Sequence, residues 1–105
     1  MKNPKISIII RTKNEEKYIS QCLKKISQQT LKDFEIIIVD NNSSDLTVKK
    51  ASIFTKKIIK IKNFLPGKAI NEGIRSSRGK IIVIISAHCI PVNNDWLKNL
   101  VKDLS

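Results

Sequence analysis

The sequence predicts an α/β domain with a mainly parallel sheet and helices on both faces of that sheet. Two observations predict this class. Strand-like apolar runs alternate with helical patterns along the whole chain, and the last of these runs is apolar on both faces. Such alternation builds right-handed βαβ units, in which successive strands run parallel. A chain of 105 residues with 41% hydrophobic residues suits one domain with one core, expected over residues 3–105.

The first strand and the first helix follow from side-chain type and spacing. Residues 5–10 form a run rich in β-branched side chains, which is typical of a strand. Apolar residues between 15 and 29 then recur at i, i+3, i+4 and i+7, the spacing of one helix face: Ile19, Cys22, Leu23 and Ile26. Glu15 and Glu16 suit the positive end of that helix's dipole. We therefore expect the helix to begin at these two acids.

A second βαβ unit is expected next. Residues 34–39 read as a strand that stops at the polar cluster 40–45, whose side chains favour turns and helix caps. A helix from 45 to about 55 and a short third strand over 57–61 complete the unit. The strands are apolar and the segments between them are polar, as expected for elements that share one core.

The last three elements are a helix, a strand and a helix. Pro66-Gly67 opens a helix through Ser77, which Gly79 is expected to close. Residues 80–85 are apolar on both faces, which is typical of a parallel strand covered on both sides. The final helix is expected from about 94 to 104. Its buried side would carry five apolar residues: Trp96, Leu97, Leu100, Val101 and Leu104.

Charge and composition narrow the classes of partner. Lysine and arginine number 20 against 9 acids, which gives a net charge of +11. This charge fits a solvated surface, an anionic small molecule, a membrane face or nucleic acid. Because the lysines are scattered and only 5% of residues are aromatic, we expect no nucleic acid partner. Two isolated cysteines predict neither a disulfide framework nor a zinc site, so a cytoplasmic location is expected.

Ligands of parallel sheets bind beyond the carboxyl ends of the strands. The common nucleotide motifs are missing there. The first strand is not followed by G-x-G-x-x-G, and Gly67-Lys68 lacks both the earlier glycine and the following Ser or Thr of a Walker A loop. The single histidine, His88, also gives no basis for a Ser/His/Asp set.

A different set of motifs is spread over the chain. Four segments occur in this order: ISIIIRTKNEE from residue 6, DFEIIIVDNNSSD from residue 33, GKAINEGI from residue 67 and RGKIIV from residue 78. This series resembles the amino-terminal half of the family 2 glycosyltransferases, which have the GT-A fold. The resemblance extends from about residue 5 to residue 104. It implies a Rossmann-like nucleotide-binding half that holds a nucleotide-sugar at the carboxyl edge of its sheet.

The resemblance also assigns residues after the first two strands. Thr12 and Asn14 would line the nucleotide pocket, and Asp40 would accept a hydrogen bond from the base or ribose. Asn41 stands where the family often has a second acid. Asp45 would cap the next helix or contact the ribose. The alternative for Asp40 is a turn or cap residue, a common role for aspartate at such a position.

Further site residues are implied on the third helix. Gly67, Lys68 and Asn71 match the loop and helix start that lie over the nucleotide in the family. A helix N-terminus with a lysine suits phosphate on physical grounds alone. The alternative is that Lys68 is a solvated helix-start residue.

The fourth strand departs from the family pattern. The family commonly holds a divalent metal, Mn²⁺ or Mg²⁺, on an Asp-x-Asp acid pair, but the residues here are Ser86-Ala87-His88. Because hard cations prefer carboxylate oxygens, we expect weak or absent metal dependence, or a metal held partly by residues outside this chain. Ser86 and His88 would instead contact the donor, with His88 as a hydrogen-bond donor or cation for phosphate. The alternative for His88 is a hydrogen-bonded loop residue.

The resemblance implies transfer of a sugar from a nucleotide-sugar donor to an acceptor hydroxyl, with inversion of the anomeric centre, as is usual in the family. The acceptor would be a glycan or lipid-linked sugar of polysaccharide or glycolipid biosynthesis, at the inner face of the membrane by peripheral association. The family's catalytic base lies in an acceptor-binding half, which we expect to be absent from this chain. Two alternatives stay open: a non-catalytic nucleotide- or anion-binding module, and a basic RNA-binding domain whose affinity falls steeply with salt.

Overall fold

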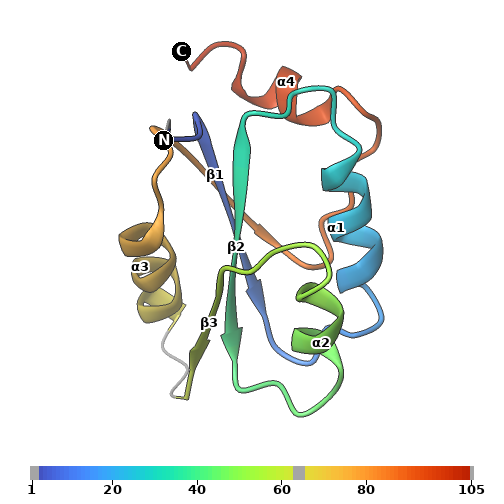
Figure 1. Ribbon diagram of the computed structural model, residues 1–105, viewed down its shortest axis with the longest axis vertical. Helices are drawn as coiled ribbons and strands as arrows, with labels where there is room; N and C mark the ends of the chain where they lie inside the picture. Colours follow the sequence, from blue (N-terminus) through green and yellow to red (C-terminus); the bar gives the residue numbers. More distant parts are fainter. Residues whose placement is uncertain (1–2, 63–65, 105) are drawn as a thin grey trace.

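The computed structural model describes residues 3–62 and 66–104. Within them, strands and helices alternate from first to last (Figure 1). The strands are β1 (Ile6–Thr12), β2 (Phe34–Asn41), β3 (Ile58–Ile61) and β4 (Ile81–Ser86). The helices are α1 (Ile19–Ser27), α2 (Thr47–Ala51), α3 (Pro66–Ser76) and α4 (Trp96–Val101). All strand pairs are parallel, which confirms the predicted class.

The two faces of the sheet carry different cores. One face, which we call the α1 face, packs Ile8, Ile10 and Ile38 against buried residues of α1, α2 and α4. The opposite α3 face packs Ile9, Ile37 and Val39. Helix α3 lies over this face across β1, β2 and β3. Because successive side chains of a strand point to opposite faces, the continuous isoleucine runs of β1 and β2 supply both cores.

The order of strands marks where a ligand can enter. The sheet order is β3-β2-β1-β4, so the chain moves outward from β1 to β3 and then returns to the other side of β1. The helices α1 and α2 therefore cover one face and α3 covers the other (Figure 1). Such a reversal is a topological switch point, and ligands bind beyond the carboxyl ends of the strands that flank it. Here those strands are β1 and β4.

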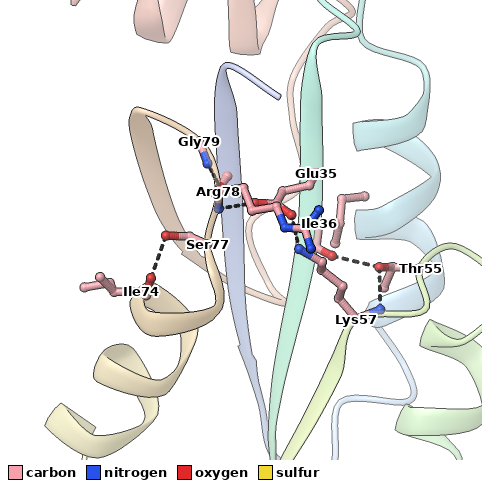
Figure 2. Close-up of polar contacts among 9 residues, drawn as sticks. Glu35, Ile36, Thr55, Lys57, Ile74, Ser77, Arg78 and Gly79 are labelled. Atoms are coloured by element: carbon pink, nitrogen blue, oxygen red, sulfur yellow. Dashed lines mark hydrogen bonds and ion pairs between the residues drawn. The ribbon is translucent and has the colours of Figure 1, made fainter. Parts of the chain in front are cut away.

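The amino edge of the sheet, where the strands begin, is fastened by Glu35 of β2 (Figure 2). One of its carboxylate oxygens pairs with the ammonium group of Lys57. The other accepts hydrogen bonds from the Ser7 hydroxyl and the Arg78 amide, each at 2.6 Å. The Gly79 amide in turn donates to the Ser7 hydroxyl oxygen at 2.8 Å. This network joins β1, β2 and the segments before β3 and β4.

Two predicted burial patterns are wrong. Strand β4 is not covered on both faces, because Ile82 and Ile84 are 37% and 40% exposed. It lies at an edge of the sheet, and α3 packs over the other three strands instead. In α4, Leu97 and Val101 are buried as predicted, whereas Leu100 and Leu104 are exposed. The described helix ends at Val101, one turn earlier than the pattern predicts.

The expected role of Gly79 is also wrong. A closing glycine adopts a positive φ, but none of the three glycines does so. The reason for glycine here is space. A Cβ atom on Gly79 would lie 2.6 Å from the backbone carbonyl carbon of Ile6 and from the amide nitrogen of Ser7. Glycine therefore permits the segment before β4 to approach β1 closely.

Helix boundaries differ from the prediction for a physical reason. Helix α1 begins at Ile19, after a turn, so Glu15 and Glu16 do not lie in its first turn. Their backbone amides donate instead to the side chains of Thr47 and Asp45, at 2.7 and 3.3 Å. These contacts hold the β1–α1 loop against the start of α2. Helix α2 is also shorter than predicted. It spans Thr47–Ala51, whereas the sequence predicts a helix from 45 to about 55.

Candidate functional site

A cavity of about 170 Å³ opens at the carboxyl edge of the sheet, beside the switch point. The ends of three strands and the β1–α1 loop line it: Arg11, Thr12, Lys13, Glu15, Val39, Asn41 and Ser86. Three of these, Thr12, Asn41 and Ser86, are predicted site residues. Strand pairing brings them together, because Thr12 lies opposite Asp40 and Ser86 lies opposite Arg11.

Asp40 lies behind Thr12. The Thr12 hydroxyl donates to one carboxylate oxygen of Asp40 at 2.6 Å, and both residues are buried. The hydroxyl and the amide of Ser43 also donate to this carboxylate, at 2.6 and 2.9 Å. The turn role considered for Asp40 is therefore present. Its predicted contact with base or ribose stays a prediction, while in this structure it fixes Thr12 at the cavity wall.

Asn14 connects two loops at the rim. Its backbone has a φ of 52°, which lies in the left-handed region that asparagine tolerates better than most residues. Its side-chain oxygen accepts a hydrogen bond from the backbone amide of Ser44 at 2.8 Å. Its backbone amide donates to the Ser43 hydroxyl oxygen at 2.9 Å. The β1–α1 and β2–α2 loops are thus held together. Nucleotide contact by Asn14 stays a prediction.

Asp45 organises the neighbouring loop. Its carboxylate accepts hydrogen bonds from the amide and the hydroxyl of Thr47 and from the Glu16 amide. Desolvation alone raises the pKa of Asp45, but these hydrogen bonds outweigh it and lower the pKa. Asp45 therefore fixes the start of α2, one of the two predicted alternatives, as an ionised carboxylate.

His88 is held beside the cavity by two residues of the β1–α1 loop. Its Nε2 atom lies 2.7 Å from a carboxylate oxygen of Glu15, and its ring centroid lies 4.3 Å from that of Tyr18. The imidazole is 57% exposed. His88 is thus a loop residue paired with Glu15, close to the alternative considered from the sequence. The contact with phosphate stays a prediction.

Cys22 anchors the loop that carries His88. Its thiol donates to the Cys89 carbonyl oxygen at 3.2 Å, which ties α1 to the β4–α4 loop. Burial, with Cys89 as a second contributor, raises the pKa of the Cys22 thiol to about 12. A thiol with this pKa is protonated at neutral pH, so Cys22 acts as a small buried hydrogen-bond donor.

The predicted residues of α3 lie away from the cavity wall. Gly67, Lys68 and Asn71 are exposed, and none of them lines the cavity. Helix α3 nevertheless begins at the same edge of the sheet, where β3 ends (Figure 1). Their contact with a nucleotide therefore stays a prediction.

Arg11 and Glu15 line the cavity, but the resemblance assigned a ligand role to neither. Arg11 falls in the stretch 11–14 after the predicted first strand, where a ligand is expected, and in the structure it is part of β1. Its side chain extends from the same face as Ile9, because strand residues alternate. The available signal was a lone charged residue at the end of an otherwise apolar strand. Glu15 was assigned to the first helix turn, and the observed turn places it at the cavity instead.

The residues at the end of β4 do not fit a hard divalent cation. Ser86 supplies a hydroxyl, Ala87 supplies no polar side chain, and His88 is paired with Glu15. The described residues contain no group of three His, Cys, Asp or Glu side chains that could hold a metal ion. Mg²⁺ is usually held by one or two carboxylates together with water and substrate phosphates, and carboxylate oxygens also suit Mn²⁺. This donor set is therefore too poor for the metal that the family implies.

The fold and the site together define a Rossmann-like nucleotide-binding domain of the GT-A type. Its four parallel strands, its switch point beside β1 and the cavity at the carboxyl edge all belong to that class. Residues 7–105 match the model of glycosyl transferase family 2, and the chain belongs to this family. The sequence-based resemblance is thereby confirmed, and the non-catalytic module is not favoured.

Several relatives and solved structures are similar to the chain. A dolichyl N-acetyl-alpha-D-glucosaminyl phosphate 3-beta-D-2,3-diacetamido-2,3-dideoxy-beta-D-glucuronosyltransferase of Methanococcus voltae is 39% identical over 92% of the chain and 33% of the relative. Mannosyltransferase PcManGT of Pyrobaculum calidifontis was solved with GDP-Man and Mn²⁺. The match covers all of the present chain and 33% of the PcManGT chain, with a TM-score of 0.89 and 25% identity. The match to Staphylococcus aureus TarS with UDP-GlcNAc covers 93% of the present chain and 30% of the TarS chain, with a TM-score of 0.82 and 25% identity.

The chain spans about a third of the length of the curated relatives it matches. Across the described residues, each helix falls short of the length and apolar character that crossing a bilayer requires.

Proposed function

We propose that this chain is the donor-binding part of a glycosyltransferase. It binds a nucleoside-diphosphate sugar at the carboxyl edge of the sheet, and the sugar is transferred to an acceptor hydroxyl. The observation that carries the proposal is the cavity beside the switch point, where Thr12, Asn41 and Ser86 present polar groups from three adjacent strands. Solved structures similar to the chain contain GDP-Man or UDP-GlcNAc, which supports a nucleotide-sugar as the ligand.

Each polar group has a task that its chemistry permits. The Asn41 amide is only 9% exposed, and it can both donate to and accept from the edge of a base or a ribose hydroxyl. Thr12 is oriented by Asp40, so its oxygen can accept from the ligand while its hydrogen stays on the carboxylate. Ser86 supplies a hydroxyl from β4 on the opposite side of β1. Together they hold the nucleotide in one orientation.

The acceptor is proposed to be a lipid-linked sugar or a growing glycan. Relatives are named for such acceptors, among them a dolichyl-phosphate sugar and a diphosphoundecaprenol oligosaccharide. A membrane-bound acceptor would place the enzyme at the cytoplasmic face by peripheral association, and the +11 charge suits an anionic surface there. The residues that bind the acceptor and deprotonate its hydroxyl are proposed to lie in the acceptor-binding half, outside the described residues.

Calorimetric titration of the 105-residue chain with UDP, GDP and dTDP tests donor binding. We expect saturable binding of one nucleotide, and about tenfold weaker binding by Asn41→Ala, because one hydrogen-bonding group is lost from the cavity. Asn99→Ala is the matched control, since it makes the same change on the exposed face of α4. Failure of the unmodified chain to bind any of the three nucleotides would overturn the proposal.

A further inference from the structure

The cavity contains a cation that the polar contacts leave unused. Arg11 lines the cavity from β1, directly opposite Ser86 of β4 in the strand register. Its Nε atom is buried and has no hydrogen-bond partner among the residues that the structure describes. A buried guanidinium nitrogen without a partner is costly, because burial removes its hydrogen bonds to water. The position therefore calls for an acceptor that is absent from the described chain.

The position of Arg11 is significant because of what lies next to it. Ser86 begins the segment that replaces the family's acid pair, and this segment does not supply the carboxylates that a hard cation needs. A diphosphate bound at this edge still requires a positive charge. The guanidinium of Arg11 is permanently charged, and its planar donor set matches phosphate oxygens in pairs.

The charges around the cavity favour an anion on the Arg11 side. Lys13 is the second cation in the cavity wall, and Glu15 is its only acid among the residues described. One carboxylate oxygen of Glu15 is 2.7 Å from His88 Nε2, so the acid is turned toward the β4–α4 loop. The ion pairs observed in the described ranges leave Arg11 without a carboxylate partner within 4.0 Å.

We infer that Arg11 binds the diphosphate of the donor in place of a metal ion, so that donor binding by this chain is independent of divalent cations. The inference rests on the proposed function, since it names the group that holds the donor's leaving group. When the sugar leaves, negative charge increases on the diphosphate, and a fixed guanidinium stabilises that charge electrostatically. Arg11 is thus assigned to both donor binding and leaving-group stabilisation.

The test compares a nucleoside diphosphate with its own nucleoside. The nucleotide that binds in the titration above is titrated again, once in EDTA and once in Mn²⁺. Its nucleoside is titrated separately, and inorganic pyrophosphate is added as a competitor of the nucleotide. We expect equal affinity for the nucleotide in EDTA and Mn²⁺, and competition by pyrophosphate in EDTA. Arg11→Gln should bind the nucleotide about 10- to 100-fold more weakly and the nucleoside unchanged, because only the diphosphate loses a charged donor.

Two further variants make the result decisive. Arg75→Gln makes the same substitution on the exposed side of α3, and it should leave every affinity unchanged. Arg11→Lys keeps the charge without the planar donor set and should fall between the wild type and Arg11→Gln. Unchanged nucleoside binding by an Arg11 variant also shows that the site is folded.

Specific outcomes would overturn the inference. These are nucleotide binding that EDTA abolishes, pyrophosphate that does not compete, or Arg11→Gln with wild-type nucleotide affinity. If Arg11→Gln does not fold, the metal and pyrophosphate measurements on the wild-type chain still decide. If the wild-type chain binds neither nucleotide nor nucleoside, the proposed function itself fails, which is a different result from metal-dependent binding.

Discussion

Each edge of the sheet has a hydroxyl of β1 hydrogen-bonded to a carboxylate of β2, but the two pairs have different surroundings. At the amino edge, the Ser7 hydroxyl of β1 donates to Glu35 of β2 at 2.6 Å. At the carboxyl edge, the Thr12 hydroxyl of β1 donates to Asp40 of β2, also at 2.6 Å. Both pairs lie directly across the strand register. The two carboxylates differ in the partners that surround them.

Glu35 is paired with a cation, and Asp40 is not. The ammonium group of Lys57 pairs with Glu35, and the Arg78 amide completes its partners. Asp40 receives only neutral donors, from Thr12 and Ser43, and none of the ion pairs in the described ranges includes it. A carboxylate paired with a fixed cation fastens the fold, whereas Asp40 accepts hydrogen bonds only from two hydroxyls and an amide. The comparison indicates that the amino edge is structural, and it supports our proposal that a ligand binds at the carboxyl edge.

Gly79→Ala is the strongest way to break the amino edge. The added Cβ atom would lie 2.6 Å from backbone atoms of β1, so either β1 or the segment before β4 must move. We expect a loss of about 3 kcal/mol in the free energy of unfolding, measured by urea denaturation. Gly67→Ala is the matched control, because nothing lies within 4 Å of its added Cβ atom, and stability should not fall. Equal stability of the two variants would contradict the close approach.

Glu35→Gln tests whether the amino edge depends on charge. The substitution keeps the shape of the side chain but removes the ion pair with Lys57 and weakens the hydrogen bonds from Ser7 and Arg78. We expect a loss of about 2 kcal/mol, because Glu35 is only 12% exposed and its partners stay in place. Nucleotide affinity should be unchanged. A fall in affinity would show that the two edges are not independent.

The same carboxylate predicts a pH dependence. Burial raises the pKa of Glu35, but the hydrogen bonds from Lys57, Ser7 and Arg78 and the charge of Lys57 outweigh it, so the pKa lies below its ordinary value of 4.5. The unfolded chain therefore binds more protons below that pH. Stability from Glu35 is fully present above pH 4.5 and is lost as pH falls through the lower folded value. Between pH 3 and 6, the urea midpoint of Glu35→Gln should fall less steeply with acid than that of the wild type. The difference corresponds to the titration of about one carboxyl group.

Much of the fold was predictable from the sequence because local patterns and the global arrangement agree. The strands have continuous apolar runs, and the α1 residues Ile19, Cys22, Leu23 and Ile26 are all fully buried, as their spacing predicts. Apolarity alone could not show that Ile82 and Ile84 are partly exposed. Their exposure depends on where α3 lies, which is a tertiary property.

The candidate site was predictable to the level of strand ends. The switch-point rule indicated the carboxyl edge, where the structure has a cavity lined by Thr12, Asn41 and Ser86. The sequence could not show that Arg11 lies opposite Ser86, since this depends on the register that sets β1 against β4. Nor could sequence spacing show that Asn14 bonds to Ser44, because these two residues are brought together by neighbouring strands.

The finest comparison removes one hydroxyl from each edge. Ser7→Ala and Thr12→Val each delete the donor that β1 offers to a carboxylate of β2, and Thr12→Val keeps the side-chain shape. Thr12→Val should lower the free energy of unfolding by about 2 kcal/mol, because a hydrogen bond to a carboxylate is lost. Ser7→Ala should cost more, because the Gly79 amide also loses its acceptor, and urea denaturation should show this larger loss.

Nucleotide titration should distinguish them. Only Thr12→Val is expected to bind the nucleotide more weakly, by about tenfold, because Thr12 lines the cavity while Ser7 lies at the opposite edge. If Ser7→Ala weakens binding as much as Thr12→Val, the affinity reflects general stability, and the carboxyl edge has no separate role. If Ser7→Ala loses more stability and affinity falls only in Thr12→Val, the same kind of hydroxyl–carboxylate pair fastens one edge and orients a ligand group at the other.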